Sequence, residues 1–318
     1  DQNTKEKQLY SSPKDQQRWW AECHFSNSGD YLILLGGSEQ EGSVVVYDAN
    51  SGEQLWIDET SHSQNVFDCD VSPDETLLAT VSLDMTARVW DIKTGEQYIQ
   101  PLQNNAGMWH CRFNEDQTKL IASDYSSRVI VWGLHNGLVL QNSIVQESPI
   151  IGIAPVSDPN KVLLALQNGK IISWNITPKN RPPVLFTHNS QITNSQLLPD
   201  DYLATSGQDS LVKIWSLKKL GEHKVLPVKE DVWHFGFSES SKKLFGFMAP
   251  SWFTVSGVTV WNWPDLSVQN VHELPPESSR VAVHPDGNLI AYSNKQDYSV
   301  EVYDLTKDTL IKRFEEHD

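Results

Sequence analysis

One pattern recurs along the chain at a nearly constant interval. A short run of β-branched residues ends in Trp or Tyr, which Asp or Asn often follows. The seven aromatic residues of this pattern are Tyr47, Trp90, Trp132, Trp174, Trp215, Trp261 and Tyr303. Their spacings are 43, 42, 42, 41, 46 and 42 residues, so successive copies of one unit occupy most of the 318-residue chain. A period of about forty residues is typical of a supersecondary unit that stacks on copies of itself.

A second pattern stays in phase with the first and marks tight turns. Ser, Pro, Asp and Gly cluster between two short apolar runs, as at residues 71–74 (VSPD) and 283–287 (VHPDG). These residue types favour turns between strands, and Gly-Glu pairs at 52–53 and 95–96 open a further strand. Each unit is therefore predicted to contain four short antiparallel strands. Seven units predict an all-β fold, a seven-bladed β-propeller with four-stranded blades around a central channel.

The residues from His62 to Asp91 resemble the WD40 repeat, and the resemblance extends over roughly residues 20 to 315. The resemblance implies a buried hydrogen-bonded tetrad, and the sequence matches it in two units. The two sets are His62, Thr80, Asp84 and Trp90, and His188, Thr205, Asp209 and Trp215. Asp would accept from the imidazole, and the Thr hydroxyl would link the imidazole to the indole N–H. A catalytic triad is the alternative interpretation, but the same spacing in two units favours a structural role.

The repeat also sets the expected domain boundaries. Residues 1–18 form a polar lead-in whose segment 7–10 is a candidate strand that latches the ring. A single propeller is expected over 19–318, with blades at 19–57, 62–100, 106–142, 148–186, 188–228, 231–272 and 277–315. Ser126, Asn168 and Val255 stand where the turn Asp belongs, so we expect packing to hold those blades. Either the seventh blade closes on the first, or the parent protein continues past His317.

The three cysteines occupy one position of the repeat. Cys23, Cys69 and Cys111 each lie two residues before the apolar end of a predicted inner strand. Other blades have mostly apolar or small residues at this position, so we expect these cysteines to be reduced and to fill the core. We expect no metal site and no cofactor, because histidine ligands do not converge on this position.

Charge and hydropathy exclude several classes of function. The formal net charge is −16 and the isoelectric point is about 5.0, which argues against direct nucleic-acid binding and against docking on anionic lipid. No run of 18 apolar residues is present, so membrane insertion is not expected. The first eight residues are polar and show no signal peptide. We expect an intracellular protein, in the cytoplasm or the nucleus.

The candidate binding site is the wider mouth of the channel. The resemblance places one residue of each inner strand there, namely Ala21, Phe67, Trp109, Ile151, Thr193, Trp233 and Ser279. Tyr125 is expected beside Phe67 and Trp109, and Asp231 and Glu277, with Asp68 and Glu230 nearby in sequence, are expected to supply an acidic flank. An exposed aromatic patch of this kind anchors a partner. The alternative is that these rings turn inward and fill the core.

These features favour a non-catalytic module that binds a protein or peptide, which we expect to be basic with an apolar anchor. We expect a monomeric propeller or a member of a multi-protein complex, and a sensing or regulatory domain of a larger protein is a further interpretation. The alternative function is a metal-dependent hydrolase or lactonase with its site in the central channel. The chain contains no phosphate loop and no nucleophile elbow, so we do not expect an enzyme.

Overall fold

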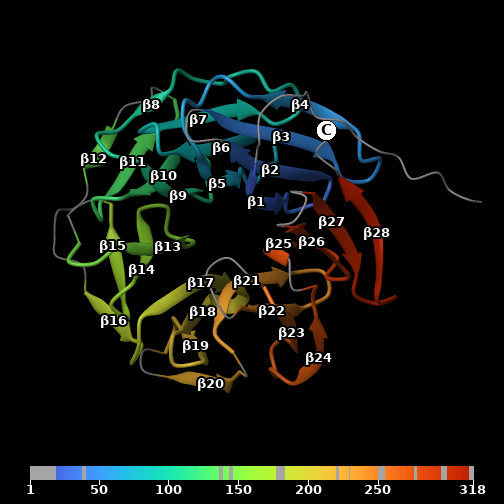
Figure 1. Cartoon of the computed structure of the whole chain (residues 1–318). Coiled ribbons are helices and arrows are strands. Elements are labelled where there is room, and N and C mark those ends of the chain that lie inside the picture. The colour runs from blue at the N-terminus through green and yellow to red at the C-terminus, as the bar shows by residue number, and fades with distance from the viewer. Residues whose placement is uncertain are drawn as a thin grey trace, which may run out of the picture.

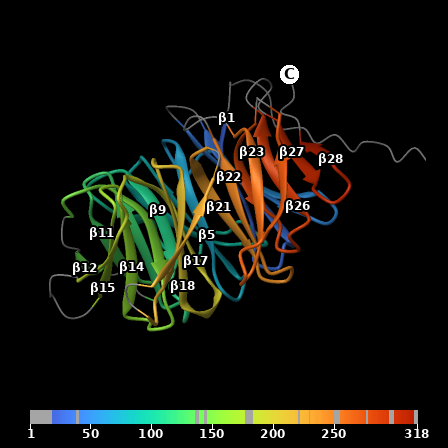
Figure 2. The same cartoon turned by 90° about the horizontal axis from the view of Figure 1, so that it is seen from below.

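The computed structural model describes residues 19–37, 41–135, 139–142, 146–176, 183–219, 222–228, 230–249, 255–275, 278–294 and 299–314. Seven antiparallel sheets of four strands each stand around a common axis (Figure 1). Figure 2 shows that the strands cross the thickness of this ring. The predicted fold class, a seven-bladed β-propeller, is confirmed.

Each blade consists of four strands that are consecutive in the chain. Blade one contains β1 (Trp19–Phe25), β2 (Tyr31–Gly37), β3 (Gly42–Asp48) and β4 (Gln54–Asp58). Blade two contains β5 (Val66–Val71), β6 (Leu77–Ser82), β7 (Thr86–Asp91) and β8 (Leu102–Gln103). Blade three contains β9 (Met108–Phe113), β10 (Lys119–Asp124), β11 (Val129–Gly133) and β12 (Val139–Asn142). Blade four contains β13 (Ile150–Pro155), β14 (Lys161–Leu166), β15 (Lys170–Asn175) and β16 (Val184–Thr187).

The remaining blades follow the same order. Blade five contains β17 (Ile192–Leu198), the 3-10 turn η1 (Pro199–Asp201), β18 (Tyr202–Gly207), β19 (Leu211–Ser216) and β20 (His223–Pro227). Blade six contains β21 (Val232–Ser238), β22 (Lys243–Met248), β23 (Gly257–Asn262) and β24 (Val268–Glu273). Blade seven contains β25 (Ser278–Val283), β26 (Leu289–Asn294), β27 (Val300–Asp304) and β28 (Thr309–Phe314). The inner strands β1, β5, β9, β13, β17, β21 and β25 contact one another in that order and surround the axis.

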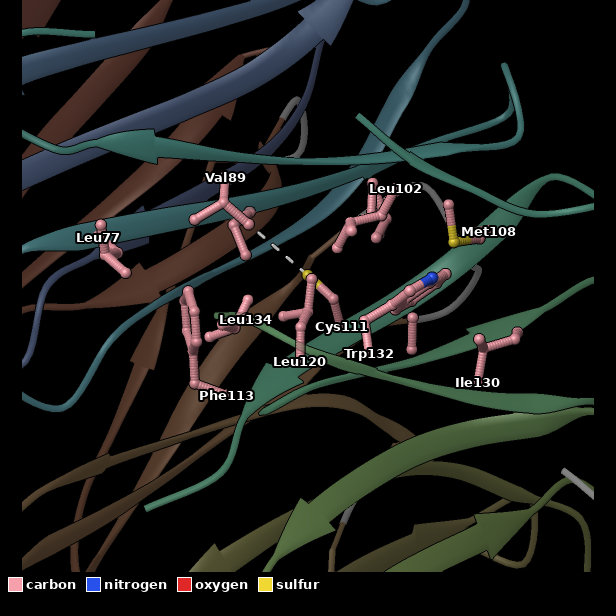
Figure 3. Close-up of a cluster of buried hydrophobic side chains, with 14 residues drawn as sticks. Leu77, Val89, Leu102, Met108, Cys111, Phe113, Leu120, Ile130, Trp132 and Leu134 are labelled. Carbon is pink, nitrogen blue, oxygen red and sulfur yellow. Dashed lines mark hydrogen bonds between the residues drawn. The ribbon is translucent and has the colours of Figure 1, made fainter. Parts of the chain in front are cut away.

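The core lies between the blades rather than within any one of them. Between blades two and three, Val89 and Leu102 pack with Cys111, Leu120 and Trp132 (Figure 3). The second strand β6 is buried along its whole length, and the other second strands along most of theirs, because a neighbouring blade covers each face. Such strands read as continuous apolar runs, whereas the outer strand β24 is almost entirely exposed. All three cysteines are buried and free of disulfides, each in a core cluster of this kind.

Blade seven closes on blade one through side chains. The carboxylate of Glu22 lies 3.0 Å from the guanidinium of Arg280, and the Phe25 and His284 rings meet edge to face with centroids 5.0 Å apart. One apolar cluster combines residues of both blades, and within it the rings of Tyr47 and Phe314 are 5.1 Å apart. The ring therefore closes on blade one. The predicted latch segment 7–10 and His317 lie outside the described residues.

The tetrad residues of blade two form a continuous buried network. Nδ1 of His62 lies 2.9 Å from Oδ2 of Asp84, and Nε2 lies 2.9 Å from the Thr80 hydroxyl. That hydroxyl accepts the indole N–H of Trp90 at 2.9 Å. Burial lowers the pKa of His62, so a neutral ring with its proton on Nδ1 satisfies every atom of the network.

The tetrad residues of blade five are joined less completely. The Trp215 indole donates to the Thr205 hydroxyl at 2.8 Å, but Nδ1 of His188 is 3.6 Å from Oδ2 of Asp209. Within the described part of the chain, Nε2 of His188 has no hydrogen-bond partner. Burial lowers the pKa of His188 to about 4, so this imidazole is also neutral at neutral pH.

Two blades outside the matched pair also contain buried polar links. In blade three the turn carboxylate comes from Asp124, two residues before Ser126, and Oδ1 accepts from the backbone of Ser126 at 2.8 Å and of Arg128 at 3.0 Å. In blade seven Glu301 is buried, pairs with Arg313 at 3.5 Å and accepts from Tyr292. These polar contacts add to the apolar packing that holds both blades.

Candidate functional site at the channel mouth

Every inner strand carries one β-bulge, and in six blades the bulge falls on the predicted mouth residue. In β5, Val66 pairs with Ser82 and Asp68 with Val81, which leaves Phe67 between them unpaired. The same irregularity falls on Ala21, Trp109, Ile151, Thr193 and Trp233. In β25 the unpaired residue is Arg280, one position after the predicted Ser279. A bulge turns a side chain away from the normal alternation of a strand, so these positions are oriented differently from their neighbours.

Three aromatic side chains of blades two and three gather at these bulges. Phe67 and Trp109 stack with centroids 5.1 Å apart, and Tyr125 meets Trp109 edge to face at 5.0 Å and Phe67 at 6.3 Å. Phe67 and Trp109 are half-buried, while Tyr125 is 53% exposed. We call Phe67, Trp109 and Tyr125 the aromatic cluster. Its rings support one another and leave apolar surface accessible to solvent.

The turn that presents Tyr125 is fixed by hydrogen bonds. The Tyr125 amide donates to the carbonyl of Gly107 at 3.0 Å. The side-chain amide of Asn104 donates to Asp124 at 3.1 Å, and the backbone N–H of Asn104 donates to the carbonyl of Met85 at 2.9 Å. The loop between blades two and three thus holds the Tyr125 turn in place beside the two stacked rings.

The other predicted apolar mouth residues lie elsewhere on the ring. Ile151 is half-buried and packs against the apolar cluster between blades four and five. Trp233 is half-buried on β21, and β13 and β17 separate that strand from β9. The structure therefore brings together Phe67, Trp109 and Tyr125. The strand that carries Trp233, β21, lies across the ring from β5 and β9 (Figure 1).

The predicted acidic flank is only partly present as an exposed surface. Glu230 is exposed and accepts from the Ser256 hydroxyl at 2.5 Å, and half-buried Asp231 accepts from the Ser210 hydroxyl at 2.8 Å. Asp68 does not join this flank, because it is only 5% exposed and its Oδ2 lies 2.6 Å from Arg112. Glu277 lies outside the described residues.

A group of charged and imidazole side chains lies on the inner strands of five successive blades. We call it the channel cluster, and its members are His234, Arg280, Glu22, His24, Asp68, Asp70, His110 and Arg112. Asp68 is its centre. Besides Arg112, its Oδ2 accepts from the backbone of Cys111 at 3.1 Å and lies 3.5 Å from Nδ1 of His110, while its Oδ1 is 3.8 Å from Nε2 of His24. One carboxylate thereby contacts the inner strands of blades one, two and three.

Burial and mutual charges move the pKa values of this cluster in different directions. Burial would raise the pKa of Asp68, but Arg112, His110 and His24 together outweigh it and hold that pKa far below its usual range. Burial raises the pKa of Glu22 and of Asp70 to about 7, against the opposing charges of Arg280 and Arg112. Burial lowers the pKa of His24 to about 4 and that of His234 to about 3. The imidazoles are consequently neutral at neutral pH.

Of the channel cluster, only Asp68 belonged to the predicted site, and Arg112 and Arg280 were not predicted. The signal was available, because every member lies directly beside the cysteine position of its inner strand. The residues before that position include Glu22, Asp68, His110, His234 and Arg280, and those after it include His24, Asp70 and Arg112. Charged residues repeated at the middle of a predicted buried strand indicate a polar channel lining.

Two further features are absent from the residues that the structure describes. No group of three or more His, Cys, Asp or Glu side chains has the arrangement of a metal site among them. In the same part of the chain, no helix is long and apolar enough to span a membrane.

The family comparison matches one repeat directly. Residues 55–91 match the model of the WD domain, G-beta repeat family, and this segment contains the complete tetrad of blade two. Seven blades of this size, the in-phase repeats and this match agree. The chain is a seven-bladed β-propeller that contains a WD40 repeat.

Known relatives of this WD40 propeller include proteins named as subunits. Target of rapamycin complex subunit wat1 of Schizosaccharomyces pombe is 27% identical, over 56% of this chain and 59% of that protein. Eukaryotic translation initiation factor 3 subunit I of the same organism is 25% identical, over 62% of this chain and 63% of that protein. Human apoptotic protease-activating factor 1 is 25% identical over 50% of this chain, but only 13% of that protein is matched. The WD40 propeller thus spans less than two thirds of these relatives.

A solved structure shows the same fold. The β-propeller domain of Myceliophteria thermophila Cps50 (Swd1) superposes with a TM-score of 0.72 and covers 90% of this WD40 propeller and 96% of that domain. The two sequences are 14% identical, so this likeness concerns the fold alone.

Proposed function

We propose that this WD40 propeller is a non-catalytic interaction module that binds a protein or peptide at the channel mouth. The observation that carries the proposal is the aromatic cluster, in which three rings from two blades pack together and remain partly exposed. Aromatic side chains held rigidly on strands lose little entropy on binding and are frequent anchors of interfaces. The relatives named as complex subunits support a role in assembly.

The partner that fits this surface has an apolar anchor and a basic flank. Aromatic faces accept both aliphatic groups and cations. Exposed Glu230 and the net charge of −16 favour a basic partner through long-range attraction. Three buried, free cysteines support an intracellular location, where thiols remain reduced.

The channel cluster supports a non-catalytic function over the hydrolase alternative. A metal-dependent hydrolase in the channel needs carboxylates or imidazoles that are free to ligate. Asp68 is occupied by Arg112 and by two backbone amides, those of Cys69 and Cys111. Asp70 accepts from the backbone of Phe113 at 2.7 Å.

The test compares affinity purifications of the wild type and two variants, followed by quantitative mass spectrometry. The test variant is Phe67→Ala with Trp109→Ala, and the control is Tyr98→Ala. Tyr98 is 54% exposed on blade two but lies between β7 and β8, away from the inner strands. We expect a specific partner that the wild type and Tyr98→Ala retain and the double variant loses by at least about tenfold. Binding would then be measured with the purified partner.

The fold of each variant is checked by circular dichroism and thermal unfolding. A folded double variant that retains the same partners as the wild type would remove the aromatic cluster from the interface. Loss of the partner in Tyr98→Ala alone would place the interface at the outer part of blade two.

A further inference from the structure

The channel cluster contains more unused hydrogen-bond donors than acceptors. Arg112 uses one terminal nitrogen for Asp68 and for the carbonyl of Cys111, and Arg280 uses one for Glu22. The other guanidinium nitrogens of both residues have no acceptor among the residues that the structure describes. Because a guanidinium carries five N–H groups, each of these residues has several donors available.

Solvent reaches these donors from the channel. The side chain of Arg112 is 34% exposed and that of Arg280 is 37% exposed, although both lie on inner strands of the ring. Arg112 contacts Asp68, which lies 3.8 Å from His24 of β1. Arg280 contacts Glu22, which precedes His24 by two residues on the same strand, so both arginines adjoin the channel side of β1.

The acceptors of the cluster are largely occupied or close to neutral. Asp68 binds Arg112 and two backbone amides, and Asp70 binds the amide of Phe113. Glu22 is already paired with Arg280. The N–H groups of Arg112 and Arg280 that face no acceptor among the described residues therefore lie beside carboxylates whose own contacts are already made, within a protein of net charge −16.

We propose that the channel cluster binds an oxyanion, a phosphate or carboxylate group, held by the guanidinium groups of Arg112 and Arg280. A planar guanidinium matches both groups through two parallel N–H···O bonds. His24 and His110 lie beside Asp68 at 3.8 Å and 3.5 Å, so both imidazoles border the region between the two arginines. This site is distinct from the aromatic cluster and requires no protein partner.

The test measures binding of sodium phosphate, sodium sulfate and sodium acetate to the isolated chain by thermal shift and isothermal titration calorimetry. Sodium chloride at equal ionic strength is the reference for screening effects. We expect saturable stabilisation by phosphate and sulfate if the site prefers a tetrahedral anion, or by acetate if it prefers a carboxylate. Either result supports the oxyanion site and shows which of the two anion classes it prefers.

The test variant is Glu22→Gln with Arg280→Gln, which removes one guanidinium without leaving an unpaired carboxylate. The matched control is Glu301→Gln with Arg313→Gln, a pair of the same type on β27 and β28 of blade seven. Arg313 is 33% exposed and its pair distance is 3.5 Å, against 37% and 3.0 Å for Arg280. We expect affinity at least about tenfold weaker in the test variant and unchanged in the control.

A single Arg280→Lys variant keeps the charge beside Glu22 and serves if the double variant does not fold. Lysine lacks the planar guanidinium that can donate two parallel N–H···O bonds, so we expect several-fold weaker binding of the anion. Anion stabilisation no greater than that of sodium chloride in the wild type would overturn the proposal. Equal affinity in the wild type and in either folded Arg280 variant would also overturn it.

Discussion

Nε2 of His62 lies 2.9 Å from the Thr80 hydroxyl in blade two, whereas no hydrogen bond joins the equivalent His188 and Thr205 in the described part of blade five. The two blades share the residues of the tetrad but not its complete geometry. In blade two the hydroxyl serves both an imidazole and an indole, and in blade five it serves only the indole of Trp215. Identical residue types therefore stabilise the two blades unequally.

Thr80→Val should destabilise the protein more than Thr205→Val. The first change leaves two buried polar groups without a partner, and the second leaves one. We expect Thr80→Val to cost about 2 kcal/mol and Thr205→Val about half of that. Urea unfolding of both variants checks the order, and equal losses would mean that the Thr80–His62 bond contributes little.

Gly29→Ala should weaken the closure between blades seven and one. Gly29 has a φ of +83°, and an added Cβ would lie 2.3 Å from Nε2 of His284. That imidazole nitrogen is also 3.2 Å from the Gly29 carbonyl. We expect a loss of about 2 kcal/mol in the free energy of unfolding.

Gly52→Ala is the control for Gly29→Ala, because Gly52 has a similar φ of +73° in a turn within blade one. Backbone strain alone predicts the same loss for both glycines, and contact with blade seven predicts a larger loss for Gly29. Chemical denaturation of the two variants separates these outcomes.

Glu22→Gln should become relatively more stable as the pH rises. Burial raises the pKa of Glu22 to about 7, so the native state favours the protonated carboxyl and the wild type loses stability as the pH rises toward that value. Glutamine does not titrate. Between about pH 5 and about pH 8, we expect the free energy of unfolding of the variant to rise by about 2 kcal/mol relative to that of the wild type.

Unfolding of both proteins in urea at several pH values measures this difference directly. Asp70 and His24 titrate in both proteins, so their contributions cancel to first order. A difference between the two proteins that does not change with pH would show that Glu22 ionises normally in the native state.

The three cysteines should react slowly with thiol reagents in the native protein. Burial raises the pKa of the Cys23, Cys69 and Cys111 thiols, so little thiolate is present and access is limited. We expect labelling of all three by iodoacetamide only under unfolding conditions. Rapid labelling of one cysteine would locate a blade that opens locally.

The repeat made the architecture predictable because the period holds in all seven blades and the turn residues stay in phase with it in several of them, although strand placement in blades four and six was not predictable. The seven aromatics at 41–46-residue spacing all lie on the third strands of their blades. Buried polar links outside the matched tetrads were not predictable, because Asp124 and Glu301 occupy positions that the repeat pattern does not mark. Side-chain geometry decides which of these groups meet, and the periodic pattern carries no such information.

The aromatic cluster was partly predictable for the same reason. Register placed Phe67, Trp109 and Tyr125 at one end of adjacent blades, and the structure brings their rings together. Register could not show that Asp68 turns to Arg112 of the next blade, because that contact depends on how two sheets stack. The bulge at Arg280 shifted the seventh position by one residue, and nothing in the local sequence marks it.

Closure of the ring by side chains has a mechanical consequence. In the described chain, every sheet is made of four consecutive strands, so no backbone ladder joins blade seven to blade one. Force applied to β1 and β28 would pull first on contacts such as Glu22–Arg280 and Phe25–His284, and not on a shared sheet. An optical-tweezers trace should then show an early opening at low force, followed by separate extensions as single blades unravel from the exposed end.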